Sequence, residues 1–306
     1  MSKNLFSFLA VGLLAPIAGA QNLLPSTKAA DFRADSKLVL VPVTVLDRKG
    51  ATVNGLMPGL FTVLEDKIVQ PIASFSQQDA PVSVGVIFDL SGSMKNSLGE
   101  ASNALHTFFA AANSEDDAFL YTVSTVPERS TTLTTDYEQL LGRLMGAKAN
   151  GSTALIDTIY AGLNDIHSAR HARKALLIVS DGMDNHSRYS KAELVGRAVE
   201  SDVQIYAVSI YNPPANKKPI ELQEERRGLE LLGDLAQRTG GLHLVVKNGT
   251  DVNQATQTIG QALRNQYLIG YVPQDAHHDG KWHAIQVKLS MKGATAYTRS
   301  GYRSDE

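Results

Sequence analysis

The stretch Asp89-Leu90-Ser91-Gly92-Ser93 constrains this chain most, because it directly follows an apolar run from Val82 to Phe88. The run is short, rich in β-branched residues and nearly free of polar ones, which predicts a strand buried on both faces of a parallel sheet. Ligands of such sheets bind at the carboxyl ends of the strands. One carboxylate, that of Asp89, and the hydroxyls of Ser91 and Ser93 therefore outline a site for a hard cation.

Two later fragments supply further oxygen ligands. Gly151-Ser152-Thr153 opens a predicted helical segment, and Ser180-Asp181-Gly182 follows a second buried run, Ala175–Val179. Two carboxylates combined with several neutral hydroxyls suit a small cation that keeps some of its water. We therefore expect Mg²⁺ or Mn²⁺ rather than Ca²⁺ in a carboxylate-rich cage or zinc in a His/Cys site.

Together, the patterns Asp-x-Ser-x-Ser, Gly-Ser-Thr and Ser-Asp-Gly resemble the metal-ion-dependent adhesion site (MIDAS) of von Willebrand factor A (VWA) domains. The resemblance covers about residues 81–246 and implies a Rossmann-like, doubly wound α/β fold. It also implies that a partner's carboxylate completes the coordination of the metal. By this resemblance the metal ligands are Ser91, Ser93 and Thr153, with Asp89 and Asp181 bound directly or through water.

Outside that stretch, the chain resembles secreted bacterial proteins in which a VWA domain is flanked by short β-rich segments, a group first described from Acidobacteria. The N-terminus agrees with secretion, because Leu5–Ile17 is apolar and Ala18-Gly19-Ala20 is typical of a signal-peptide cleavage site. A membrane anchor is the alternative, but the apolar stretch is too short to span and contains Pro16. We expect a signal peptide at residues 1–20, no membrane span after its cleavage, and a secreted or periplasmic protein.

The chain contains no cysteine, which excludes disulfides, thiolate metal sites and a cysteine nucleophile. Its formal net charge is −2, and the dense basic cluster Arg170–Lys174 is interpreted as the solvated end of a helix. We therefore expect no nucleic-acid partner. Nucleotide-binding glycine motifs and a G-x-S-x-G nucleophile elbow are also absent from the sequence.

The strand and helix patterns divide the chain into further segments. A flexible leader is expected at 21–36, an N-terminal β segment at 37–80, a VWA-like α/β domain at 81–248, and a C-terminal helix and β segment at 249–306. The N-terminal segment is expected to begin with a hairpin that joins Leu38–Leu46 to Ala51–Val53. Each β segment is too small to bury a core alone, so we expect both to pair into one antiparallel β-sandwich. Two separate β appendages are the alternative.

Within the α/β domain, strands alternate with helical segments, as in βαβ units. Strands are expected at 82–89, 118–124, 175–180, 203–210 and 242–246, and helices at 97–112, 137–145, 154–168, 191–200 and 229–238, with a last helix ending near 264. A long charged loop is expected at Pro213–Arg227, where it is a candidate for partner specificity.

The expected function is a metal-dependent protein-binding module, an adhesion or scaffold protein of the bacterial envelope, with no catalytic residues. One alternative is a divalent-metal-dependent hydrolase, for which Asp184 or His186 would be the general base. Another is a structural envelope domain with a non-functional metal site. Asp184, Asn185 and His186 either rim the metal site or belong to an ordinary strand-to-helix loop. The partner, protein or glycan, and the oligomeric state stay open.

Overall fold

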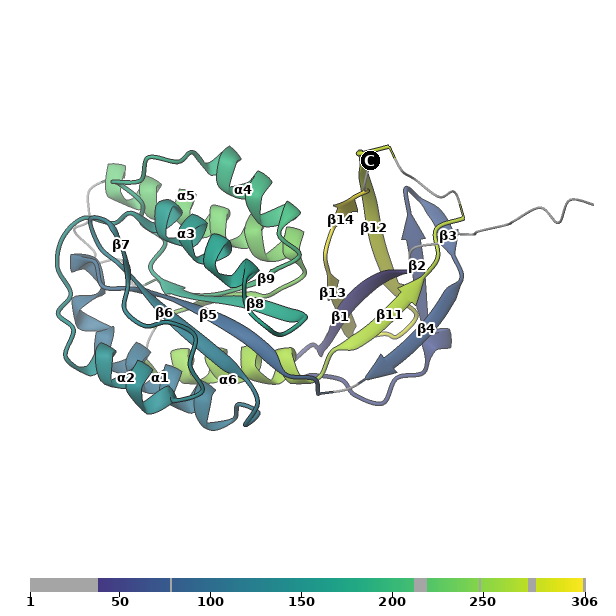
Figure 1. The fold of residues 1–306 in the computed structure, drawn as a ribbon, viewed down its shortest axis with the longest axis horizontal. Helices are drawn as coiled ribbons and strands as arrows, with labels where there is room; N and C mark the ends of the chain where they lie inside the picture. The colour runs from purple at the N-terminus through teal and green to yellow at the C-terminus, as the bar shows by residue number, and fades with distance from the viewer. Residues whose placement is uncertain (1–37, 78, 212–218, 248, 275–278, 305–306) are drawn as a thin grey trace, which may run out of the picture. The chain divides into compact units, whose positions relative to one another are not determined.

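The computed structural model describes residues 38–77, 79–211, 219–247, 249–274 and 279–304. Within them lie a region of alternating strands and helices, here called the α/β region, and an antiparallel β-sandwich (Figure 1). The predicted signal peptide and leader fall outside the described residues.

The α/β region is built on a six-stranded sheet, and its neighbouring strands are parallel except for the antiparallel pair β6 and β7. The doubly wound, mostly parallel sheet predicted from the apolar runs is therefore confirmed. Every residue of the strands β5, β6 and β9 is buried, which explains why their sequences are mostly apolar. In spatial order the strands are β10 (His243–Val246), β9 (Gln204–Ile210), β8 (Arg173–Ser180), β5 (Val82–Asp89), β6 (Asp117–Val123) and β7 (Pro127–Arg129).

Helices cover both faces of this sheet (Figure 1). On one face, α1 (Leu98–Ala110), α2 (Tyr137–Met145) and α6 (Gly249–Arg264) share a core with Val86 and Phe88. On the other face, α3 (Leu155–His167), α4 (Lys191–Glu200) and α5 (Pro219–Thr239) share a core with Ile87. Successive residues of β5 thus enter opposite cores, as the two-residue period of a strand requires.

The β-sandwich consists of two four-stranded sheets whose facing side chains form one core, including Val43, Val63, Tyr267 and Ile285. Each sheet combines strands from both ends of the chain, so the prediction of one sandwich is right and the two separate appendages are wrong. One sheet holds β13 (Ala294–Thr298), β1 (Val39–Asp47), β11 (Tyr267–Tyr271) and β4 (Ile72–Gln77); the other holds β14 (Gly301–Arg303), β12 (Trp282–Leu289), β2 (Phe61–Glu65) and β3 (Ile68–Gln70). A short 3-10 helix, Pro58–Leu60, precedes β2.

The predicted hairpin between Leu38–Leu46 and Ala51–Val53 is present, although its second arm is short. The Asp47 N–H donates to the Ala51 carbonyl (2.8 Å), the Val53 N–H donates to the Val45 carbonyl (2.9 Å), and Leu46 and Thr52 form an isolated antiparallel bridge. Most of the pairing of β1 is with the distant strands β11 and β13. The opposing sheet covers the apolar face of β1, which a local hairpin alone would leave open to water.

The prediction of a charged loop at Pro213–Arg227 is partly wrong. Residues 212–218 lie outside the described residues, but α5 begins at Pro219, so Glu221 and Arg227 belong to a helix. Proline is favoured in the first helical turn because it has no N–H to leave unpaired, and the acidic Glu221 in that turn complements the helix dipole. None of the helices found in the described residues is long and apolar enough to cross a membrane.

Candidate metal site

Asp89 ends β5 and is fully buried. Its Oδ1 accepts a hydrogen bond from the Ser91 N–H (2.8 Å), and its Oδ2 accepts one from the Ser180 hydroxyl (2.5 Å). Ser180 is the last residue of β8, which pairs with β5 in the sheet. The pairing of two parallel strands therefore brings the first and third sequence fragments together at their carboxyl ends.

The hydroxyls of the first fragment lie side by side. Ser91 Oγ and Ser93 Oγ are 3.0 Å apart, and Ser91 is buried while Ser93 is exposed at the start of the short 3-10 helix Gly92–Asn96. The side-chain oxygens of Asp89, Ser91 and Ser93 thus lie progressively closer to the protein surface.

Thr153 lies on a loop that is hydrogen-bonded to both of the other fragments. The Asn150 N–H donates to the Leu90 carbonyl (2.8 Å), which ties this loop to the first fragment. The Thr153 N–H donates to Asn185 Oδ1 (2.9 Å), and the Thr153 carbonyl accepts the N–H groups of Asn185 and His186. The loops of all three fragments therefore meet at one edge of the sheet, and the Thr153 side chain is buried there.

Two of the three residues that either rim the site or belong to an ordinary loop, Asp184 and Asn185, hold the loops of the site. Asp184 Oδ1 accepts the Ile156 N–H (3.1 Å) and the Ser187 hydroxyl (2.5 Å), so it caps the first turn of α3. Asn185 fixes Thr153 as described above, and the His186 side chain is exposed. Oδ1 of Asp184 is thus used to hold the start of α3 and the loop of Ser187.

Two carboxylates share this edge without a cationic side chain. Burial, and next the charge of Asp181, raise the pKa of Asp89 to about 7, against the opposing hydrogen bonds from Ser180 and Ser91. No lysine, arginine or histidine of the described residues forms an ion pair with Asp89 or Asp181. A bound divalent cation would offset both the repulsion and the desolvation of this pair, so the oxygen donors present fit Mg²⁺ or Mn²⁺.

The backbone of a helix supports the Asp181 loop, and this support was not predicted from the sequence. Gly182 follows Asp181 with a φ of +85°, and Gly228 of α5 packs against it. A Cβ atom at Gly228 would lie 1.6 Å from the Gly182 carbonyl oxygen, so no side chain fits between the two backbones. In the sequence Gly228 stands between the expected loop and the expected helix at 229–238, and only the longer α5 makes it a glycine within a helix, which often marks such a close approach.

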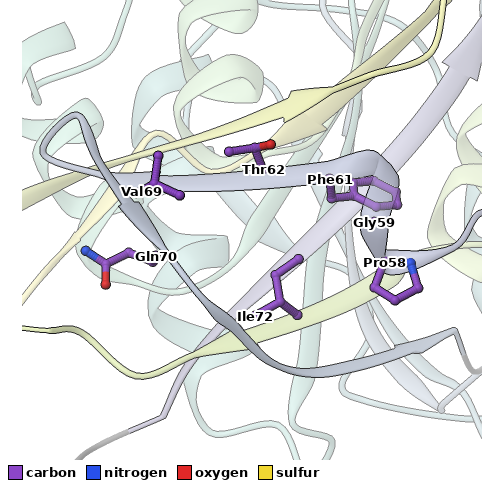
Figure 2. A pocket seen from close by; sticks show the side chains of 7 residues that line it. All are labelled: Pro58, Gly59, Phe61, Thr62, Val69, Gln70 and Ile72. Atoms are coloured by element: carbon purple, nitrogen blue, oxygen red, sulfur yellow. The ribbon is translucent and has the colours of Figure 1, made fainter.

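The β-sandwich carries an open cavity of about 340 Å³, which is shown in Figure 2. Its lining residues are Pro58, Gly59, Phe61, Thr62, Val69, Gln70 and Ile72. These residues include no charged side chain, and none of them belongs to the three metal-site fragments. The cavity lining therefore offers no charged ligand for a cation.

Comparison with known proteins agrees with this geometry. The family model of the von Willebrand factor type A domain matches residues 84–183, which contain all three fragments. None of the curated proteins matches the chain significantly.

Several solved structures are similar to parts of this chain. A von Willebrand factor type A protein from Catenulispora acidiphila is 13% identical over 90% of this chain and 76% of that chain, with a TM-score of 0.52. Proximal thread matrix protein 1 from the mussel byssus is 13% identical over 72% of this chain and 50% of that chain, with a TM-score of 0.50. BatB from Bacteroides thetaiotaomicron is 16% identical over 59% of this chain and 98% of that chain, with a TM-score of 0.47. Residues 84–183 therefore match the von Willebrand factor type A domain, and the fold of the chain agrees with that match.

Proposed function

We propose that this protein binds a protein partner through a divalent cation, Mg²⁺ or Mn²⁺, held by Asp89, Ser91, Ser93, Thr153 and Asp181. The observation that carries the proposal is the buried Asp89 carboxylate, which feels the charge of Asp181 and has no basic partner among the described residues. Buried charges in proteins are normally paired or bind a metal. A cation at this edge supplies the missing positive charge.

The chain's own residues prepare the site. Ser180 and the Ser91 N–H hold the Asp89 carboxylate in one orientation, and Asn185 holds the loop of Thr153. With two carboxylates and three hydroxyls, the protein supplies few anionic ligands, so a bound cation keeps affinity for a further carboxylate. We therefore propose that the partner contributes an aspartate or glutamate side chain.

The partner is proposed to be a protein of the bacterial envelope, with this chain as an adhesion or scaffold module that is secreted or periplasmic. The signal-peptide pattern of residues 1–20 supports that location. The von Willebrand factor type A domain supports a binding role. A metal-dependent hydrolase has less support, because Asp184 already caps α3.

The first experiment is calorimetric titration of Mg²⁺ and of Mn²⁺ into the metal-stripped protein. Asp89→Asn removes one charge without changing size, and Thr153→Ala removes one hydroxyl. We expect Asp89→Asn to abolish detectable binding and Thr153→Ala to weaken it, with circular dichroism unchanged. Glu138→Gln, which neutralises an exposed carboxylate on α2, is the matched control and is expected to bind as the wild type does.

Wild-type protein that binds neither ion would contradict the proposal. If binding is confirmed, the partner is sought by capture from an envelope fraction in Mg²⁺ and again in chelator. A specific partner is retained by wild type in Mg²⁺ and lost both in chelator and with Thr153→Ala. A protein retained equally in all three conditions does not use the cation.

A further inference from the structure

β2, β3 and β12 belong to one sheet of the β-sandwich (Figure 1). Three side chains with metal-ligand atoms meet at this sheet. Glu65 ends β2, Asp66 lies in the turn to β3 with a φ of +47°, and His283 is on β12, which pairs with β2. Each residue offers one ligand atom, and the three atoms lie within 4.8 Å of one another. One imidazole and two carboxylates form a mixed nitrogen and oxygen donor set.

Each of these side chains is also held from outside the group. Asp66 Oδ1 accepts the Ala284 N–H (2.9 Å), while its Oδ2 lies 2.8 Å from His283 Nδ1. The Glu65 carboxylate accepts hydrogen bonds from the hydroxyls of Tyr271 and Tyr302. Ligands of bound metals are commonly oriented by such partners, which set the direction of their lone pairs.

The second ring nitrogen of His283 also lies beside a carboxylate. His283 Nε2 lies 3.3 Å from Asp279 Oδ1, and Asp279 is itself fixed by the Lys281 N–H (3.0 Å) and the Ser304 hydroxyl (2.8 Å). When His283 donates its Nε2 proton to Asp279, the lone pair of Nδ1 faces Asp66. A carboxylate behind the distal imidazole nitrogen is a frequent feature of histidine metal ligands.

Burial differs among the three side chains in a way that suits a metal site. Glu65 and His283 are 2% and 5% exposed, whereas Asp66 is exposed. The two buried ligands are shielded from water, and an ion can enter from the side of Asp66. A site of this kind needs both a protected interior and a path for the ion.

We propose that Glu65, Asp66 and His283 bind a divalent transition metal, with Zn²⁺ as the best match, and that Asp279 is a positioning residue for His283. Imidazole nitrogen suits Zn²⁺, whereas Mg²⁺ and Ca²⁺ prefer oxygen ligands. The ion takes the place of the proton between His283 Nδ1 and Asp66 Oδ2. Binding would tie the β2–β3 turn to β12 across 217 residues of sequence and so stabilise the sandwich.

The test is calorimetric titration of Zn²⁺ into the purified protein in the presence of saturating Mg²⁺. We expect one Zn²⁺ per chain, a raised melting temperature, and the same result in Asp89→Asn, because the proposed adhesion site is separate. His283→Gln is expected to abolish this binding, and Glu65→Gln to weaken it strongly. Asp279→Asn should weaken it by about 10- to 100-fold, the range typical of residues that orient a metal ligand.

His106→Ala is the matched control, because His106 is an exposed histidine on α1 that should not contribute. If a variant fails to fold, the ring nitrogen signals of His283 in the unmodified protein decide the question by NMR. One equivalent of Zn²⁺ should shift its Nδ1 resonance. An unshifted resonance, or equal Zn²⁺ binding by wild type and His283→Gln, would overturn the proposal and leave the hydrogen bonds of His283 to Asp66 and Asp279 as structural contacts.

Discussion

The α/β region and the β-sandwich assemble their polar groups in different ways. In the α/β region the polar residues of the candidate metal site follow buried strands, and the parallel arrangement brings Asp89 and Ser180 to one edge. In the sandwich the meeting groups lie on or beside antiparallel strands far apart in sequence, as Asp66 and His283 do. A parallel sheet gathers ligands through its topology, whereas an antiparallel sandwich gathers them through the register of individual strand pairs.

This difference implies different sensitivities to mutation. The edge of the α/β sheet depends on close backbone packing, because its loops are held by hydrogen bonds and by the contact of Gly182 with Gly228. The cluster of Glu65, Asp66 and His283 in the sandwich depends instead on contacts between side chains. Substitutions that change backbone spacing should therefore affect the first site most, and substitutions that only remove polar atoms should have smaller effects.

The largest effect is expected for Gly228→Ala. The new methyl group would collide with the Gly182 backbone, which cannot move without displacing the Asp181 loop. We expect a loss of about 3 kcal/mol of unfolding free energy, at the upper end for overpacked sites, and weaker Mg²⁺ binding. Urea denaturation and Mg²⁺ titration measure the two effects.

Gly142→Ala on α2 is the matched control, since a Cβ atom there meets no atom within 4 Å. It should stabilise the protein by about 0.5–1 kcal/mol, because alanine is a better helix former than glycine. A Gly228→Ala protein as stable as wild type, with unchanged Mg²⁺ affinity, would show that the helix and the loop are not in the close contact described here.

A smaller effect is expected for Gln266→Leu, where the two regions meet. Gln266 is buried, and its amide nitrogen lies within hydrogen-bond distance of Gln204 Oε1 (2.9 Å) and the Tyr206 hydroxyl (3.0 Å) on β9 and of Thr44 Oγ1 (3.3 Å) on β1. Its carbonyl oxygen accepts from Arg173 (3.1 Å). Leucine leaves these polar groups without this partner, so we expect a loss of about 2 kcal/mol.

Scanning calorimetry of Gln266→Leu then tests whether this network couples the two regions. We expect a lower melting temperature and a broadened or divided transition. Gln261→Leu, on the exposed side of α6, is the control and should leave the transition unchanged. An unaltered single transition in Gln266→Leu would mean that the two regions are coupled by other contacts.

The α/β region could largely be predicted from sequence, and the sandwich only in outline. Helices α2 and α4 have the predicted boundaries, because the capping box of Ser190 with Glu193 and clear apolar periodicity mark them locally. The doubly wound sheet followed from the buried runs. The register that sets Glu65 and Asp66 beside His283 carried no local signal, because a strand pair across most of the chain is fixed by the whole core.

The residues that support the candidate metal site were likewise not predictable from local sequence patterns. The three fragments predicted Asp89, Thr153 and Asp181. The helix that supports the Asp181 loop was predicted to begin at residue 229, whereas α5 begins at Pro219. The basic cluster was interpreted as solvated, yet Arg173 donates to Gln266 and to the Ala80 carbonyl (2.7 Å). Such roles depend on which elements pack together, and periodicity alone does not show that.

The smallest effect on stability is expected for the buried carboxylate of Asp157 on α3. Glu65 is the buried carboxylate of the sandwich with which it is compared. Asp157 Oδ1 accepts the N–H groups of Arg188 (2.9 Å) and Tyr189 (3.0 Å), whereas Glu65 is held by tyrosine hydroxyls. Burial opposes ionisation of Asp157, but the hydrogen bonds from Tyr189 and Arg188 and the Arg188 charge outweigh it and hold its pKa below the usual value.

A lowered pKa means that the charged form of Asp157 stabilises the fold above the pKa of an unfolded aspartate, about 3.9, and that this stabilisation is lost as the pH falls below it. Asp157→Asn should therefore cost about 1 kcal/mol at pH 7 and progressively less in acid. Urea denaturation of wild type and variant from pH 7 to about pH 3 measures the difference. A difference that stays constant over this range would show that Asp157 stabilises the loop through packing, with no contribution from its charge.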